Sequence, residues 1–313
     1  MDDFVVGVNL PWLDYGQDFG ANAWQPRGGL ARPERRERLR RSLGDIADAG
    51  VPLVRWWLLG DGRAGLREDA EGRLEGLDDR LFPDVDAALE EVRAAGLQVQ
   101  FVATDFLWFD RPRRVNGARL GGRRAHVRER AGRERLLEGV LAPIAERYGH
   151  EPAIAGWDLL NEPEWATLGV GTLDPRRSIS RREMRELLRD VAAVFRARAT
   201  QPLSVGLASR RWLSLLDGLE LDHYQVHWYE SLDSVDTLAR PVEALGLGRP
   251  LLLGEFPTRG SSVGPRRILE IAREAGYSGA LAWSALASDR ATDSLACHRS
   301  LRDWCGAPAT RQA

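Results

Sequence analysis

The sequence predicts an α/β protein of the (β/α)8, or TIM-barrel, class that forms one domain over residues 1–313. Short apolar runs rich in β-branched and aromatic residues alternate eight times with amphipathic stretches rich in Arg, Glu, Ala and Leu. Eight strand and helix pairs in a chain of this length are typical of this barrel. A doubly wound open sheet is the alternative, but no glycine-rich fingerprint follows the first apolar run.

Each predicted strand is a short apolar run that ends close to polar, Gly or Pro residues. Parallel strands buried on both faces have this character, because helices cover one side and the barrel interior the other. The eight predicted strands are Phe4–Asn9, Leu53–Trp57, Gln98–Ala103, Ile154–Leu159, Pro202–Leu207, His223–His227, Pro250–Leu253 and Gly279–Trp283.

A helix is predicted after each strand, and several helices carry start or stop signals. Pro33 stands at a helix start, and Gly50, Gly96 and Gly276 stand just past helix ends. The predicted helices are Pro33–Ala49, Phe82–Ala95, Ala131–Tyr148, Ser180–Arg198, Arg210–Leu219, Ser231–Leu245, Val263–Ala275 and Asp293–Trp304.

Two connections, 9–32 and 105–130, are long for loops between a strand and a helix. Loops after the strands of such barrels carry their active sites, so these two segments are expected to shape a site. No linker or internal repeat divides the chain.

Composition gives no sign of a nucleic-acid or membrane partner. The net charge is −2, the pI is near 6.3, and all 44 basic residues are arginine, which we attribute to genome composition. The arginine-rich stretch 31–50 contains interleaved glutamates at helical spacing, as a solvated helix face does. No apolar run approaches the length of a membrane span, and the first residues lack a secretion-signal pattern, so a cytoplasmic location is expected.

Cysteine and histidine give no metal or disulfide pattern. Cys297 and Cys305 are eight positions apart, which is too far for a bond between them if one helix carries both. Four histidines show no ligand spacing and are interpreted as structural or exposed, namely His126, His150, His223 and His298.

Chemistry-bearing residues gather where the predicted strands end, and in a barrel all these ends face one mouth. Glu162 and Glu255 follow the fourth and seventh strands, which lie across the barrel from each other. Two facing carboxylates suit glycoside hydrolysis, with retention of configuration if they lie about 5 to 5.5 Å apart. The other strand-end residues are Asn9, Arg55, Asp105, Asn161, His227, Tyr229 and Trp283.

At these residues the chain resembles the retaining glycoside hydrolases of clan A, most closely family 5, the cellulase and mannanase group. The Asn-Glu-Pro piece after a strand is the most specific part of the match. Where many cellulase-type members place a histidine after strand three, this chain has Thr104 and Asp105. The matching pieces are WDLLNEPE (157–164), HWY (227–229), LLLGEF (251–256), VRWW (54–57) and LAWS (281–284).

The resemblance implies that Glu162 is the general acid/base and Glu255 the nucleophile. It also implies that Asn161 bonds the sugar 2-hydroxyl, that Arg55 and Tyr229 hold the nucleophile, that His227 lines the site and that Trp283 floors the cleaved subsite. For these roles, a neighbouring ionised Glu255 would raise the pKa of Glu162, and Arg55 would keep Glu255 charged. Each of these residues has a structural alternative. Arg55 is then an ion-pair partner, His227 a hydrogen-bonded histidine of the barrel and Trp283 a core residue. The two glutamates are then salt-bridged or solvated residues of the loops.

Aromatic residues are concentrated in the loops around the expected mouth. Their flat rings can stack on the CH faces of sugars, with loop packing as the alternative for each. Trp56, inside a strand, is expected in the core or facing a helix. The candidate substrate-binding residues in these loops are Trp12, Asp105, Trp108, Trp165 and Trp228.

The sequence thus predicts a retaining glycoside hydrolase that acts on a β-linked glycan or oligosaccharide, without a metal or organic cofactor. A catalytically silent carbohydrate-binding barrel is the first alternative. A metal-assisted barrel enzyme is the second, and the missing ligand clusters count against it. The sugar, the linkage and the oligomeric state stay open.

Overall fold

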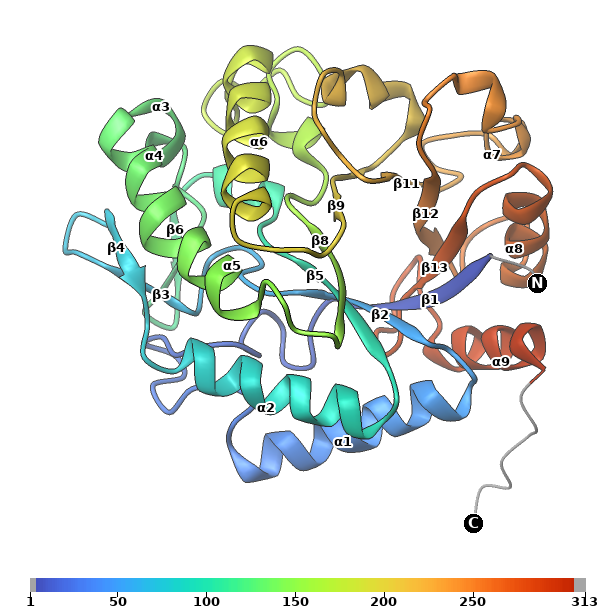
Figure 1. Ribbon diagram of the computed structural model, residues 1–313, viewed down its shortest axis with the longest axis horizontal. Helices are drawn as coiled ribbons and strands as arrows, with labels where there is room; N and C mark the ends of the chain where they lie inside the picture. The colour runs from blue at the N-terminus through green and yellow to red at the C-terminus, as the bar shows by residue number, and fades with distance from the viewer. Residues whose placement is uncertain (1–3, 307–313) are drawn as a thin grey trace.

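A computed structural model describes residues 4–306, and its central element is one parallel sheet that curls into a barrel (Figure 1). The sheet order is β10-β11-β12-β13-β1-β2-β5-β8-β9, and all neighbouring strands pair in parallel. The predicted TIM-barrel class is therefore confirmed. The strands are β1 (Val5–Leu10), β2 (Leu53–Trp57), β5 (Gln98–Val102), β8 (Ile154–Asp158), β9 (Leu203–Ser204), β10 (Gly206–Leu207), β11 (Tyr224–His227), β12 (Leu251–Pro257) and β13 (Gly279–Trp283).

The two ends of this order, β9 and β10, are the halves of the single strand predicted at 202–207. The strand breaks at Val205 because Gly206 turns its N–H to the Asp158 side chain (3.0 Å) and its carbonyl accepts from the Glu162 N–H (2.7 Å). Because β8 pairs with one half and β11 with the other, the sheet runs almost full circle.

Helices surround the sheet, and α1 and α2 lie side by side (Figure 1). Buried Glu91 on α2 accepts from Arg36 and Arg40 on α1, which ties the pair together. A serine and glutamate capping box, Ser180 with Glu183, begins α6. The helices are α1 (Pro33–Asp48), α2 (Leu81–Ala94), α3 (Ala125–Arg128), α4 (Arg130–Leu136), α5 (Ala142–Tyr148), α6 (Arg181–Arg196), α7 (Val235–Ala239), α8 (Pro265–Glu274) and α9 (Ser294–Cys305).

Three predicted helices differ from the structure. The stretch 231–245 is wrong as one helix, because Pro241 puts Arg240 in an extended conformation after α7, and only a 3-10 turn (Glu243–Leu245) follows. The stretch 210–219 is a 3-10 segment (Arg210–Leu216). Between α4 and α5 the helix widens into a π-turn (Leu137–Leu141), where Pro143 cannot donate to the preceding turn.

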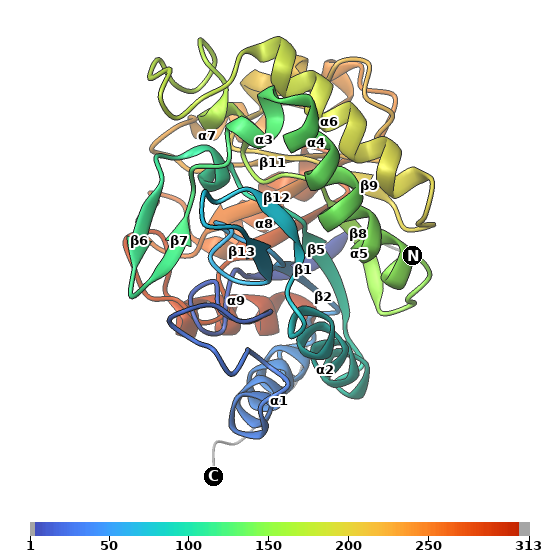
Figure 2. The same ribbon diagram turned by 90° about the vertical axis from the view of Figure 1, so that its left-hand side faces the viewer.

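Two hairpins were not predicted; one lies between β2 and α2, and the other lies in the long connection 105–130. One pairs β3 (Leu66–Glu68) with β4 (Leu74–Leu77), labelled in Figure 1, and the other pairs β6 (Arg113–Val115) with β7 (Ala118–Leu120), labelled in Figure 2. The second turns at Asn116 and Gly117, which both have positive φ. An Asn-Gly pair between two short strands is a hairpin signal that could have been found in the sequence.

Alternation along the strands sorts side chains between the core and the barrel interior. Trp56 is fully buried among Phe19 and Phe101, which confirms its expected core position. Its neighbours Arg55 and Trp57 point the other way, into the barrel. A buried polar layer fills the interior there, formed by Arg55, Gln100, Asp158, Ser204 and Gln225.

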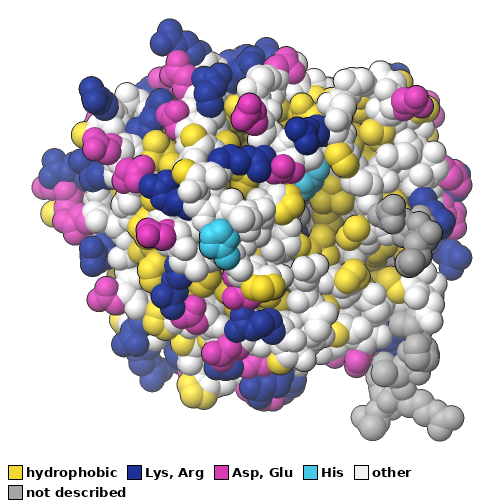
Figure 3. All heavy atoms as spheres, in the orientation of Figure 1, with side chains coloured by type: hydrophobic (Ala, Val, Ile, Leu, Met, Phe, Trp, Pro, Cys, Tyr) yellow, Lys and Arg dark blue, Asp and Glu magenta, His cyan; other side chains and the backbone are white. Residues whose placement is uncertain are grey.

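The described residues carry a mixed-charge surface and two free cysteines. On the face in Figure 3, arginine and acidic side chains are interspersed. Within residues 4–306, no helix has the length and apolar character needed to cross a bilayer. Cys297 and Cys305 are both free, the first buried and the second exposed.

Candidate active site

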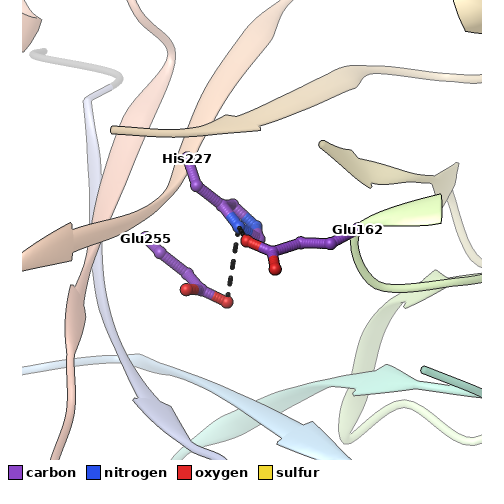
Figure 4. Close-up of side chains that lie close together, drawn as sticks. All are labelled: Glu162, His227 and Glu255. Atoms are coloured by element: carbon purple, nitrogen blue, oxygen red, sulfur yellow. Dashed lines mark hydrogen bonds and ion pairs between the residues drawn. The ribbon is translucent and has the colours of Figure 1, made fainter. Parts of the chain in front are cut away.

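The carboxyl ends of β8, β11 and β12 bring two glutamates and a histidine together (Figure 4). Glu255 lies inside β12, which extends past the predicted end of this strand to Pro257. His227 ends β11 and is in register with Glu255. Glu162 follows β8 at the start of a 3-10 turn (Pro163–Ala166), in a left-handed conformation with φ of 49° that is rare for a residue with a side chain.

The two carboxylates face each other at short range. One oxygen of Glu162, one oxygen of Glu255 and a ring nitrogen of His227 all lie within 4.8 Å of one another. His227 Nδ1 is 2.8 Å from Glu162 Oε1 and 3.5 Å from Glu255 Oε1. This spacing is close to that of retaining glycosidases and well below the 6.5 to 9.5 Å or so of inverting enzymes.

Two donors hold Glu255. Arg55 Nη1 donates to Oε1 and the Tyr229 hydroxyl donates to Oε2, each at 2.8 Å. The guanidinium is fully buried and also donates to Asp158 from Nε (3.0 Å) and Nη2 (2.7 Å). Arg55 is therefore both a structural ion-pair partner and a contact of Glu255, and the fork geometry of arginine allows both.

Asn161 is fixed by partners on both sides of its amide. Its Oδ1 accepts from Arg55 Nη2 (2.8 Å), and its Nδ2 donates to Asp105 Oδ2 (2.9 Å), which also accepts from Trp57 Nε1 (3.0 Å). Arginine has only donors and a carboxylate only acceptors, so the amide cannot flip without losing both bonds. The second Nδ2 hydrogen stays available to a ligand.

Burial sets the protonation of the site. It raises the pKa of Glu162 to about 7, against the opposing effects of Arg55 and of a hydrogen bond from Trp165. Burial also raises the pKa of Glu255, opposed by His227, Arg55 and Tyr229. Charge repulsion from Glu255 was the expected cause of the raised pKa of Glu162. That prediction is corrected, because removal of Glu162 from water has the larger effect on its pKa.

Two neighbours also titrate away from their ordinary ranges. Burial lowers the pKa of His227 to about 4, so its ring is neutral at pH 7. Burial raises the pKa of Asp105 to about 7, although Leu107 N–H, Trp57 and Asn161 all donate to it. Groups with such shifts in a cleft are typical of active sites.

A cavity of about 500 Å³ opens over these residues. Most of the predicted site residues line it, and several aromatic side chains lie among its lining, as is common in sugar-binding clefts. The predicted site residues among its lining are Trp12, Asp105, Asn161, Glu162, Trp165, Tyr229, Glu255 and Trp283.

Two of the predicted substrate-binding tryptophans lie elsewhere, and those predictions are corrected. Among the described residues that line the cavity, neither Trp108 nor Trp228 appears. Trp108 is buried beside the Arg123 guanidinium, 5.0 Å from its ring, and Trp228 is buried with its indole N–H donating to Ser234 O. Both pack the loops and do not present a face to the cavity.

Sequence reasoning missed two residues of the site. Trp57 lines the cavity, and Asp158 anchors Arg55 from below. Strand alternation could have found Trp57, because it lies two residues from Arg55 and so on the same face of β2. Asp158 carried a weaker signal, a charged residue inside an apolar strand, which is uncommon unless it is paired.

The cluster of Glu162, His227 and Glu255 has the size of a metal site. Arg55, however, places a permanent positive charge 2.8 Å from Glu255, and a bound cation would have to share that carboxylate with it. The donor set therefore favours proton transfer over metal binding.

Comparisons with known proteins agree with the predicted relationship. No family model matches the chain. A mannan endo-1,4-β-mannosidase of Mytilus edulis is 25% identical over 326 residues, which cover 90% of this chain and 83% of that protein. One of Cryptopygus antarcticus is 24% identical over 176 residues, 55% of this chain and 40% of that protein.

Solved structures confirm the fold. An endo-1,4-β-mannanase of Eisenia fetida superposes with a TM-score of 0.79 at 20% identity, covering 97% of this chain and 91% of that one. The β-mannanase of Mytilus edulis gives 0.76 at 20% identity, covering 97% and 92%. These structures confirm the barrel fold, and they and the relative of Mytilus edulis are named as mannanases, in agreement with the predicted resemblance.

Proposed function

We propose that this chain, a glycoside hydrolase of the clan A, family 5 type, cleaves internal β-1,4 linkages of mannan and of longer manno-oligosaccharides with retention of configuration. The close pair of Glu162 and Glu255 carries the proposal of retention. The choice of mannan rests on what the relatives are named for, and the aromatic cavity supports a carbohydrate ligand.

In the first step, a Glu255 oxygen attacks the anomeric carbon while protonated Glu162 gives its proton to the departing glycosidic oxygen. Arg55 and Tyr229 fix the orientation of the attacking carboxylate. A pKa of about 7 leaves a large share of Glu162 protonated at neutral pH, as a general acid needs.

In the second step, Glu162 is a carboxylate and accepts a proton from water as the water oxygen attacks the anomeric carbon. The bond to Glu255 breaks, and the sugar leaves with its original configuration. Neutral His227 can donate from Nδ1 to the newly ionised Glu162, which stabilises it between the two steps.

The test is mass spectrometry of the intact protein after incubation with 2-deoxy-2-fluoro glycosyl fluorides of mannose and glucose, as mono- and disaccharides. Wild type is compared with Glu255→Ala. The expected result is an adduct from the manno compounds that maps to Glu255 and is absent from the variant. An adduct on another residue would overturn the assignment of the nucleophile.

A second assay addresses the substrate and the mode of attack. Mannan, cellulose and short manno-oligosaccharides are compared by viscosity and by reducing ends released. Rapid loss of viscosity with few new ends on mannan supports internal cleavage, whereas faster turnover of cellulose would refute the choice of sugar. Binding of mannan without any adduct or hydrolysis would favour the silent carbohydrate-binding barrel.

A further inference from the structure

Trp165 touches the carboxylate of Glu162 as well as the cavity. Its indole Nε1 donates to Glu162 Oε2 at 3.0 Å, while His227 Nδ1 lies 2.8 Å from Oε1 on the other side. Both oxygens of the glutamate are thus held before any substrate binds. The sequence prediction for Trp165 was a stacking surface for sugar, and this contact was not expected.

The local backbone creates the contact. Glu162 and Trp165 are three residues apart at the start of the 3-10 turn, and side chains at this spacing lie on the same side of such a turn. The Trp165 N–H also donates to the Glu162 carbonyl (3.1 Å). The turn begins at Pro163, whose fixed φ favours it.

The indole ring is itself supported on two sides. Trp212 packs against it in a T-shaped arrangement, with ring centroids 5.2 Å apart and planes at 75°. The backbone of Gly171 lies so close that a Cβ there would be 2.9 Å from ring atom Cε3. A ring held in this way cannot turn its N–H from Glu162 without displacing the loop around residue 171.

We propose that Trp165 is a positioning residue that holds the Glu162 carboxyl group for proton transfer, in addition to lining the cavity. Each carboxylate oxygen has two lone pairs, so Oε2 keeps one for the proton that it gives to the glycosidic oxygen. The inference rests on the proposed role of Glu162 as acid/base.

The contact has a chemical consequence besides orientation. An N–H that donates to a carboxylate stabilises the ionised form, and Trp165 accordingly lowers the pKa that burial raises in Glu162. Loss of the donor therefore raises the pKa of Glu162 further. The other titratable or charged groups around Glu162 are Arg55, Asp105, Asp158, Glu164, His227, Tyr229 and Glu255.

The main test is Trp165→Phe, which keeps an aromatic ring and removes the N–H. The alkaline limb of the kcat/KM profile is expected to move to higher pH, by on the order of 0.5 to 1 unit. At the optimum, kcat on an unactivated oligosaccharide is expected to fall by about 10- to 100-fold, with much less loss on aryl glycosides whose leaving groups need no proton.

Trp12→Phe is the matched control, because Trp12 lines the same cavity but packs on the Tyr15 ring, at 4.5 Å between centroids. It is expected to change KM and to leave the alkaline limb in place. If Trp165→Phe behaves as Trp12→Phe does, with equal losses on both kinds of leaving group and no shift of the limb, Trp165 is only a stacking surface.

A measurement on the wild-type chain covers the case in which Trp165→Phe does not fold. With 15N-labelled tryptophan, two indole N–H signals are expected to titrate with apparent pKa values near 7, that of Trp165 following Glu162 and that of Trp57 following Asp105. In Glu162→Gln the titration of the Trp165 signal is expected to vanish, while that of Trp57 remains. Absence of a titrating Trp165 signal in wild type, or its survival in Glu162→Gln, would overturn the inference. This result does not depend on hydrolysis, so an inactive wild type would count against the proposed function alone.

Discussion

Exchange of Glu162 for glutamine is expected to make the protein more stable at alkaline pH while it abolishes general acid catalysis. In the folded chain burial raises the pKa of Glu162 from 4.5 to about 7. The folded state therefore keeps its proton up to about pH 7, whereas the unfolded chain releases it near 4.5. As the pH rises through this window, wild type loses stability, because the folded state must hold a buried charge.

The size of the effect follows from the shift. A difference of about 2.5 pKa units corresponds to about 3 kcal/mol, since each unit is worth 1.36 kcal/mol. The free energy of unfolding of Glu162→Gln, minus that of wild type, is expected to increase by about this amount between pH 4 and pH 8. Effects of the amide itself, such as altered hydrogen bonds to His227, do not depend on pH in this way and cancel in the comparison.

The assay is urea unfolding at fixed ionic strength and several pH values, followed by the fluorescence of the 11 tryptophans. Glu243→Gln, an exchange at an exposed position, controls for the chemical change. A difference that stays constant from pH 4 to pH 8 would refute the argument that burial raises the pKa of Glu162. A difference that decreases would show that its ionised form is favoured in the fold.

Four further substitutions test other parts of the site and its surroundings. Arg55→Lys keeps the charge but loses the guanidinium fork that reaches Glu255. We expect kcat to fall on the order of 100-fold and the acidic limb of the pH–rate profile to move to higher pH. An unchanged pH profile would contradict this. Gly206→Ala would place a Cβ 2.8 to 2.9 Å from three buried side chains. We expect kcat to fall and the free energy of unfolding to decrease by about 1 to 3 kcal/mol, seen as a lower urea midpoint. Full retention of both would contradict this. Trp12→Ala is expected to raise KM for oligosaccharides by about 10-fold, because Trp12 lines the cavity. Trp108→Phe is expected to lower the free energy of unfolding by about 1 kcal/mol and to leave KM unchanged, because Trp108 is buried. The reversed pattern would return Trp108 to the substrate site.

The barrel and the carriers of its chemistry were predictable because their signals are local. Strand and helix periods appear in short windows of sequence, and eight alternations leave few folds to choose from. Parallel strands present their carboxyl ends to one mouth, so Glu162, His227 and Glu255 could be assigned to one site before any coordinates. The hairpin and Trp57 were also predictable from local signals, the Asn-Gly pair for the hairpin and the alternation along β2 for Trp57.

The sequence could not determine the contacts between distant parts of the chain. Whether a loop tryptophan faces a ligand or the core depends on the loops packed around it, and so Trp108 and Trp165, similar in sequence position, differ in their surroundings. The break of the fifth strand likewise depends on Asp158 from a neighbouring strand.

The protonation of the site likewise depends on contacts between distant parts of the chain. Nearby charges can be guessed from strand ends, but removal from water depends on every element that covers the mouth, and this is the larger effect on Glu162. The sequence by itself determined the barrel and which residues meet at its mouth. The tertiary structure alone decided which of them touch, how each carboxylate is oriented and how strongly it holds its proton.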